Sequence, residues 1–257
     1  MNILVTSGGT TEKIDAVRSI SNMSTGKLGS LIADCFADKP GIDKIFYICN
    51  RSAVKPNSNK AEIIHIDDVL SLETAIKTVL SNTCIDIIVH CMAVSDYRVG
   101  SVLSASSFID LVISNLDTIK ELNNQDVSSQ ILSLLKNSEL DLCGDGKISS
   151  NIDNMLLFME RTPKIISLFQ SFSPKSTLVG FKLLNSVPLE KLIDSGYQIL
   201  TKNKCSFVLA NDLKDISNEQ HIGYLIDKDR NYVEYSSKSD IASAIVDATI
   251  RKELNQF

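Results

Sequence analysis

The sequence lacks the features that mark membrane-spanning, exported and nucleic-acid-binding proteins. Its longest nearly apolar run, residues 85–94, includes Asp86 and His90 and falls well short of the roughly 20 residues of a membrane helix. The start, M-N-I-L-V-T, has no basic segment and no cleavage site, so we expect no export. Lys and Arg number 26 against 31 Asp and Glu, a net charge of −5, so we expect no nucleic-acid partner and no membrane partner.

The chain also lacks paired cysteines. Its six cysteines are far apart and form no C-x-x-C motif, which is typical of free thiols in a reducing compartment, so we expect a cytoplasmic protein. They are Cys35, Cys49, Cys84, Cys91, Cys143 and Cys205. Hydrophobic residues make up 44% of the chain and charged residues 22%, which favours a globular protein with a sizeable core.

Short apolar runs alternate with helical patterns along the sequence. Strands are predicted at 2–6, 44–49, 61–66, 85–89, 147–150, 177–181 and 206–210, and helices at 26–37, 69–80, 162–172 and 189–203. A hairpin is predicted at 222–226 and 232–235, followed by a helix over 239–254. This order predicts an α/β fold: a Rossmann-like, mostly parallel sheet with helices on both faces, plus the C-terminal hairpin and helix.

Residues 100–146 interrupt this alternation. The segment is rich in Ser, Asn, Asp and Leu, and its first part, to about residue 138, has a weak helical pattern but no strand that would extend the sheet. We therefore predict one domain, residues 1–257, with a flap-like insertion at about 100–146.

Small or polar residues follow several predicted strands. They are Ser7-Gly8-Gly9, residues 93–96, Gly180-Phe181 and residues 210–212. Ligands of open α/β sheets bind beyond the carboxyl ends of the strands, so these clusters are candidate pocket residues. Since any strand must end in something polar, each cluster alone has an equally good structural explanation.

Two common nucleotide motifs are missing. Gly8-Gly9 does not begin a G-x-G-x-x-G fingerprint, and the Gly-Lys pairs at 26–27 and 146–147 are followed by Leu28 and Ile148 instead of the Ser or Thr of a Walker A loop. The Tyr224 and Lys228 spacing resembles a dehydrogenase pair, but it falls in the predicted hairpin. An oxidoreductase is therefore only an alternative.

Residues 17–29, V-R-S-I-S-N-M-S-T-G-K-L-G, surround a predicted helix start. Exposed backbone N–H groups at such a terminus, with Arg18 and Lys27 nearby, suit an anionic ligand. An ordinary helix cap with surface charges explains the same pattern.

The segment from Val5 to Gly29, V-T-S-G-G-T-T-E-K-I-D-A-V-R-S-I-S-N-M-S-T-G-K-L-G, resembles the opening signature of phosphopantothenate-cysteine ligase, an enzyme of coenzyme A biosynthesis. Further segments match in order: A-V-S-D-Y-R at 93–98, K-I-S-S at 147–150, T-P-K-I at 162–165, V-G-F at 179–181 and A-N-D at 210–212. Because the signature begins at residue 3, the chain resembles the free-standing ligase without the decarboxylase that precedes it in many bacterial members.

The resemblance implies a two-step reaction. The carboxylate of 4'-phosphopantothenate attacks a nucleoside triphosphate, CTP in most bacterial relatives with ATP as the alternative, and cysteine then displaces the nucleotide monophosphate. Mg²⁺ and fixed cations are expected to neutralise the negative charges. The resemblance also implies a homodimer to which the flap at 100–146 contributes. A nucleotide-binding Rossmann-like protein without ligase activity is the remaining alternative.

The resemblance also implies residue roles. Asn22, Arg18 and Lys147 are predicted to be catalytic, with Asn22 donating to the developing oxyanion. The nucleotide is expected at Gly8, Gly9, Ala93, Asp96, Lys147, Thr162, Pro163, Lys164, Ile165, Phe181 and Lys202. Asn22, Ser24, Thr25 and Gly26 are expected to bind the other substrate, and no residue is assigned to a metal.

Some positions depart from the family pattern. Met92 replaces an alanine, Lys164 an aspartate and Gln198 a lysine, and residues 182–185 replace an acidic stretch, so base preference is open. Spacing links the histidines to no metal site. His65 and His90 are expected in the core or at a sheet edge, and His221 in a solvent-exposed loop. Cys91 and Cys205 have no histidine placed to activate them.

Overall fold

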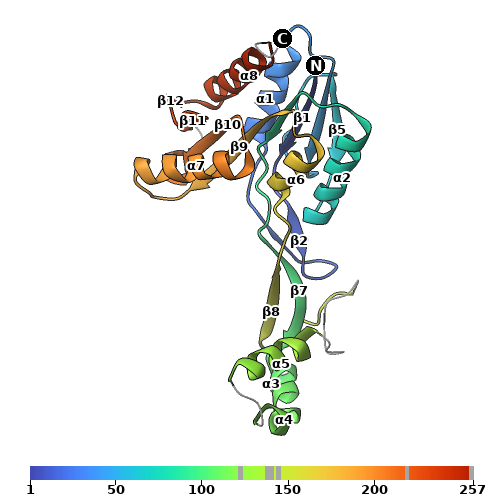
Figure 1. The fold of residues 1–257 in the computed structure, drawn as a ribbon. Coiled ribbons are helices and arrows are strands. Elements are labelled where there is room, and N and C mark those ends of the chain that lie inside the picture. The colour runs from blue at the N-terminus through green and yellow to red at the C-terminus, as the bar shows by residue number, and fades with distance from the viewer. Residues whose placement is uncertain (121–123, 137–141, 143–145, 218–219, 255–257) are drawn as a thin grey trace. The chain divides into compact units, whose positions relative to one another are not determined.

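The computed structural model describes residues 1–120, 124–136, 142, 146–217 and 220–254 (Figure 1). Contacts within the chain divide it into two compact units. The first comprises Met1–Thr10, Asn22–Val94 and Lys164–Phe257, and the second Thr11–Ser21 and Ser95–Pro163. The predicted insertion at 100–146 falls within the second unit, which is larger than that segment.

The first unit contains an eight-stranded sheet in the order β12-β11-β10-β9-β6-β1-β4-β5. Its parallel strands are β1 (Asn2–Ser7), β4 (Lys44–Cys49), β5 (Ala61–His65), β6 (Ile87–His90), β9 (Thr177–Leu184) and β10 (Phe207–Asp212). The hairpin strands β11 (Gly223–Asp227) and β12 (Tyr232–Tyr235) extend the sheet in antiparallel fashion. The Rossmann-like fold class is confirmed.

Helices cover both faces of this sheet. On one face, α1 (Lys27–Ala37) and α8 (Lys238–Leu254) pack over side chains such as Val5 and Val179. On the other face, α2 (Val69–Asn82), α6 (Ile165–Phe172) and α7 (Leu189–Asn203) pack over Leu4 and Val208. The continuous apolar runs of β1 and β6 follow from this arrangement, since both faces of a central parallel strand are buried. None of the described helices has the length and apolarity to cross a bilayer.

The second unit consists of two antiparallel strand pairs and three helices. One pair is β2 (Thr11–Lys13) with β3 (Ser19–Ser21), and the other is β7 (Tyr97–Ser104) with β8 (Met155–Arg161). The helices are α3 (Ala105–Ser114), α4 (Leu116–Lys120) and α5 (Asn124–Lys136). A bulge between Val99 and Ser101 interrupts the β7–β8 pairing.

The predicted elements of the first unit are confirmed, with boundary changes of a few residues. In the second unit two predictions are wrong. Residues 147–150 form no strand, because the N–H of Ile148 donates to the Asp15 carboxylate instead of a neighbouring strand. The segment from 100 onward is more regular than predicted: it completes β7 and forms the three helices, and β8 was missed because its side chains are only half-buried or exposed.

Candidate functional site

The glycine turn after β1 brings several predicted site residues of the first unit together. Gly8 has a φ of 82°, a conformation that favours glycine. Gly9 pairs with Ala93 in an isolated parallel bridge. The N–H of Ala93 donates to the carbonyl of Gly8 at 2.9 Å, and the N–H of Thr10 donates to the carbonyl of Ala93 at 3.2 Å. The ends of β1 and β6 are therefore linked.

The backbone of Asn22 lies directly against this turn. Its N–H donates to the carbonyl of Thr10 at 3.2 Å. A Cβ atom at Gly9 would lie 2.1 Å from the carbonyl oxygen of Asn22, so only glycine allows this approach. The Asn22 side chain is exposed. The predicted catalytic amide is thus held at the carboxyl end of the sheet by its own backbone and is open to a ligand.

The first turn of α1 continues from the same segment. Gly26 caps the helix with a φ of 73° and offers no side-chain hydrogen bond to the N–H groups that follow. The hydroxyl of Ser7 donates to the carbonyl of Gly26 at 3.1 Å, which fixes the cap beside β1. Ser24 is half-buried and Thr25 is exposed. The predicted substrate residues therefore lie together at a helix N-terminus that favours anions.

Asn50 is a candidate that the sequence analysis missed. It follows β4, and its Oδ1 atom is buried without a hydrogen-bond partner within the described residues. A Cβ atom at Gly8 would lie 2.5 Å from Oδ1, so Asn50 lies against the glycine turn. The signal was available, because Asn50 is another polar residue directly after an apolar strand.

In the second unit, Asp15 binds the predicted catalytic residue Arg18 and also Ile148, the residue that follows Lys147. Its buried carboxylate accepts from the N–H groups of Arg18 at 2.7 Å and Ile148 at 3.1 Å. The guanidinium of Arg18 donates to the carbonyl of Ile148 at 3.1 Å. Hydrogen bonds from the backbone, that of Val17 first, lower the pKa of Asp15 below its ordinary value despite burial. Arg18 and the exposed Lys147 are thus held in one neighbourhood.

The ends of the β7–β8 ribbon place two nucleotide candidates together. The N–H of Thr162 donates to the carbonyl of Asp96 at 3.1 Å, and its hydroxyl donates to the carbonyl of Ser95 at 2.5 Å. Asp96 is exposed, as is Pro163. In the first unit, exposed Lys164 is the N-cap of α6 and Ile165 begins the helix with its side chain buried.

Two further predicted residues lie at opposite ends of the sheet. Phe181 is in the carboxyl half of β9, half-buried on the face covered by α1 and α8. Lys202 is in the last turn of α7, which leads into the amino end of β10. The structure therefore does not bring Lys202 to the carboxyl edge where Gly9, Asn22 and Ala93 meet.

The buried histidines of the first unit belong to no ligand cluster among the described residues, and Cys91 and Cys205 are poor nucleophiles. His90 Nδ1 lies 2.7 Å from the Thr6 hydroxyl, and burial lowers the pKa of His90 to about 4. Burial also raises the pKa of Cys91 and Cys205 to about 12, far from a reactive thiolate. Within the described residues, no three His, Cys, Asp or Glu side chains group as metal ligands.

The exposure predicted for His221 is wrong. Its side chain is only 6% exposed, because an isolated bridge to Ile216 and a hydrogen bond to the carbonyl of Ser236 fold its loop inward.

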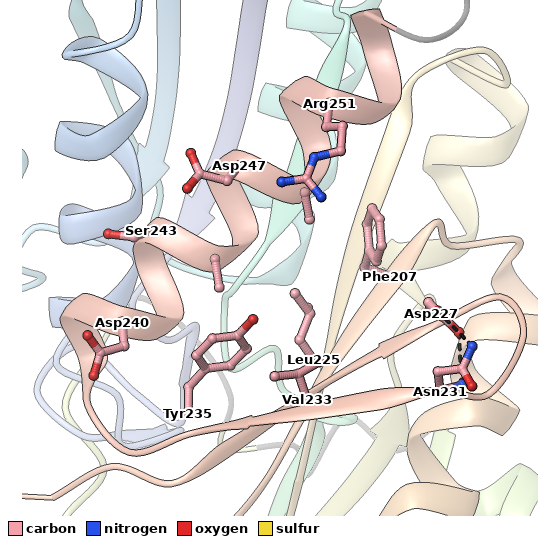
Figure 2. Close-up of a pocket in the computed structure, with 12 residues that line it drawn as sticks. Phe207, Leu225, Asp227, Asn231, Val233, Tyr235, Asp240, Ser243, Asp247 and Arg251 are labelled. Carbon is pink, nitrogen blue, oxygen red and sulfur yellow. Dashed lines mark hydrogen bonds between the residues drawn. The ribbon is translucent and has the colours of Figure 1, made fainter.

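A separate groove of about 550 Å³ lies between α8 and the β11–β12 hairpin (Figure 2). Its lining includes Phe207, Leu225, Val233, Tyr235 and Arg251. None of the predicted site residues lines it, so it is not the candidate active site.

Comparison with known proteins identifies the family. The profile of the DNA/pantothenate metabolism flavoprotein C-terminal domain matches residues 1–132 and 141–252. The chain belongs to this family. The resemblance predicted from the motifs is confirmed, because the matching relatives include coenzyme A biosynthesis proteins.

Three similar proteins illustrate the range of similarity. The bifunctional protein CoaBC of Thermococcus kodakarensis is 28% identical over 227 residues, which covers 88% of this chain and 45% of that protein. The chain of a DNA/pantothenate metabolism flavoprotein from Streptococcus pneumoniae is 32% identical, with a TM-score of 0.79 and coverage of 98% and 99%. A Cab2 variant solved with phosphopantothenate-cysteine shares the fold, with 15% identity, a TM-score of 0.68 and coverage of 99% and 86%. The chain spans about half the length of the CoaBC relatives with the broadest matches.

Proposed function

We propose that the protein is a ligase of coenzyme A biosynthesis that joins 4'-phosphopantothenate to cysteine. The observation that carries this proposal is the contact of the Asn22 backbone with Gly9 and Thr10, which fixes the residue assigned to the acyl nucleotide by the family resemblance. The names of the relatives support it: the matched CoaBC proteins are coenzyme A biosynthesis proteins, and the Cab2 variant holds phosphopantothenate-cysteine.

The proposed reaction has two steps. A carboxylate oxygen of phosphopantothenate attacks the α-phosphorus of CTP, which forms an acyl cytidylate and releases pyrophosphate. The nitrogen of cysteine then attacks the acyl carbon, and an amide bond forms as CMP leaves and the amine gives up a proton. ATP is the alternative nucleotide.

Each predicted catalytic residue suits a different charge in these steps. In the first unit, the Asn22 amide can donate to the oxyanion that develops on the acyl carbon, and such donors act strongly when they are held in place. In the second unit, Arg18 uses one of its five donors for Ile148 and keeps others for a phosphate. Lys147 offers a compact positive charge to a phosphate oxygen.

The donor set fits Mg²⁺ that is bound mainly by the nucleotide. Magnesium in such sites is held by one or two carboxylates together with substrate phosphates, and Asp96 is an exposed carboxylate among the predicted nucleotide residues. When bound, the ion neutralises triphosphate charge and makes pyrophosphate a better leaving group.

We also propose that the protein forms a homodimer through the helical part of the second unit. Ile109, Ile113 and Leu132 are 54%, 61% and 58% exposed. Ile109 and Ile113 are one turn apart on α3, Leu132 is on α5, and exposed aliphatic side chains of this kind are typical of subunit interfaces. Light scattering of the wild type and of an Ile109→Ser/Ile113→Ser variant tests this: a wild-type dimer that becomes a monomer supports it, and a wild-type monomer excludes it.

Pyrophosphate release tests the activity. The purified protein is incubated with 4'-phosphopantothenate, Mg²⁺ and either CTP or ATP, each with and without cysteine. Release that requires phosphopantothenate, with sustained turnover only when cysteine is present, supports the ligase, and the faster nucleotide identifies the base. If neither nucleotide supports release, the chain is a nucleotide-binding relative without ligase activity.

A further inference from the structure

The pair formed by Asn211 and His221 lies at the same edge of the first unit as the proposed site and has no role in the reaction above. Asn211 is the second-last residue of β10, and its side chain is 8% exposed. His221 lies in the loop before β11 and is 6% exposed. The Nδ2 atom of Asn211 lies 3.3 Å from Nε2 of His221. Two polar side chains are therefore buried together at the carboxyl end of a parallel strand.

The atoms in this contact determine which side chain donates and which accepts the hydrogen bond. An amide nitrogen only donates, so Nε2 of His221 must accept and the ring proton resides on Nδ1. That Nδ1 group has no hydrogen-bond partner within the described residues although it is buried. Burial, and secondarily the charge of Lys238, lowers the pKa of His221 to about 4, so the ring stays neutral and keeps its acceptor at neutral pH.

The opposite face of β10 is anchored independently. The carboxylate of Asp212 accepts from the N–H groups of Ser186 at 2.8 Å and Val187 at 2.9 Å. Burial alone would raise the pKa of Asp212, but these backbone hydrogen bonds and one from Lys214 lower it. The backbone at Asn211 is paired with Leu183 of β9, and neither this pairing nor the Asp212 contacts use the His221 side chain, so we assign the histidine to orienting the Asn211 side chain.

Asn211 also lies near a predicted nucleotide residue. Leu209 is the register partner of Phe181 on the neighbouring strand. Side chains two residues apart along a strand lie on the same face, so Asn211 shares the face of Phe181. With one of its two N–H groups donated to His221, the carboxamide is held in one orientation and offers Oδ1 as an acceptor and its second N–H as a donor.

We infer that His221 is a positioning residue that turns the Asn211 carboxamide so that Oδ1 accepts a hydrogen bond from an N–H donor of a substrate. This inference rests on the proposed ligase function. The cysteine amine and the amino group of the nucleobase both supply such a donor, and separate titrations of the substrates distinguish them.

Three substitutions separate positioning from folding. His221→Leu removes the acceptor, His221→Gln keeps an oxygen that can accept from Asn211, and His65→Leu changes an exposed histidine of β5 as a control. Steady-state KM values are measured for CTP, cysteine and phosphopantothenate, together with kcat and the melting temperature. We expect His221→Leu to raise the KM of one substrate about tenfold, while His221→Gln restores most of it and kcat changes less than KM.

The melting temperature provides the second readout. His221→Leu removes one buried unpaired donor, Nδ1 of His221, but leaves Nδ2 of Asn211 without its acceptor, so the melting temperature is expected to change little, whereas loss of a histidine that holds the fold would lower it clearly. Two results would overturn the inference without affecting the proposed ligase function. One is that His221→Leu has unchanged KM values, and the other is that His221→Gln raises KM as much as His221→Leu does. If the wild type has no ligase activity, binding of CTP and of cysteine is measured by calorimetry, and an unchanged affinity of His221→Leu for both overturns the inference separately.

Discussion

The two units bury their apolar side chains to very different extents. In the first unit, Leu72 of α2 and Phe36 of α1 are fully buried between helix and sheet. In the second unit, α3 has no buried residue, and Ile113 is 61% exposed. The comparison shows that the first unit owes its stability to its own core, whereas the helices of the second unit carry apolar surface suited to a further partner.

The largest expected effect is on the free energy of unfolding, which is compared after one leucine side chain is shortened in each unit. Leu72→Ala, at a fully buried position, should lower the free energy of unfolding by about 2–5 kcal/mol. Leu132→Ala, at a position 58% exposed, should change it by less than about 0.5 kcal/mol. Urea unfolding at low protein concentration, where a dimer would dissociate, measures both. Equal losses would show that the second unit has a core of its own.

Asn22→Asp tests whether this residue of the first unit promotes the reaction of the acyl nucleotide with cysteine. The substitution keeps the size of the side chain but replaces the amide donor by a negative charge, so folding should be retained while kcat falls about a hundredfold. Single-turnover measurements should show pyrophosphate release with delayed CMP release, since the acyl nucleotide accumulates. Met23→Ser, at a neighbouring side chain that is 99% exposed, is the control. Normal steady-state rates in Asn22→Asp would remove this residue from the catalytic set.

Glycine-to-alanine changes sharpen the comparison further. At Gly9 the added methyl group meets the Asn22 carbonyl oxygen at 2.1 Å, whereas at Gly146 no atom of the described residues lies within 4 Å. We expect Gly9→Ala to cost about 1–3 kcal/mol of stability and most of the activity. Gly146→Ala should behave like the wild type in both assays. A fully active Gly9→Ala protein would contradict the proposed placement of Asn22.

The smallest effect is expected for Asp15→Asn, which weakens the contacts around Arg18 and Ile148 inside the second unit. Because the folded-state pKa of Asp15 is lowered, its contribution to stability is present above the unfolded value of about 3.9 and is lost as the pH falls through the folded value. Asp15→Asn should therefore reduce stability at pH 7 and flatten its decline below about pH 4. Hydrogen exchange at residues 17, 18 and 148 localises the change, and Asp110→Asn on the exposed side of α3 is the control.

The same contrast explains what the sequence could predict. Runs such as Ile3-Leu4-Val5 alternate with helical patterns, so the strands and helices of the first unit and the glycine turn at the sheet edge were predictable. The β7–β8 ribbon was not, because most of its side chains are half-buried or exposed and only Val102 and Leu103 are buried.

Long-range contacts limited the prediction of the site. The hydrogen bond between Ile148 and Asp15 joins residues that are 133 positions apart, so no local pattern predicts it. The burial of His221 likewise depends on a backbone bridge to Ile216. Asn22 and Ala93, from two of the family motifs, both contact the glycine turn through Thr10, whereas Lys202 lies in the last turn of α7, away from that edge.

The hydrogen bonds of Thr162 to Ser95 and Asp96 have a consequence for folding. Pairing β9 with β6 requires the chain to close a loop over residues 91–176. Loop-closure entropy grows only with the logarithm of the flexible length, and joining residues 95 and 162 removes most of that length, which saves roughly 1 kcal/mol. The free energy of forming the parallel sheet therefore depends little on the length of the segment between β7 and β8, so insertions and deletions in that segment are tolerated during evolution.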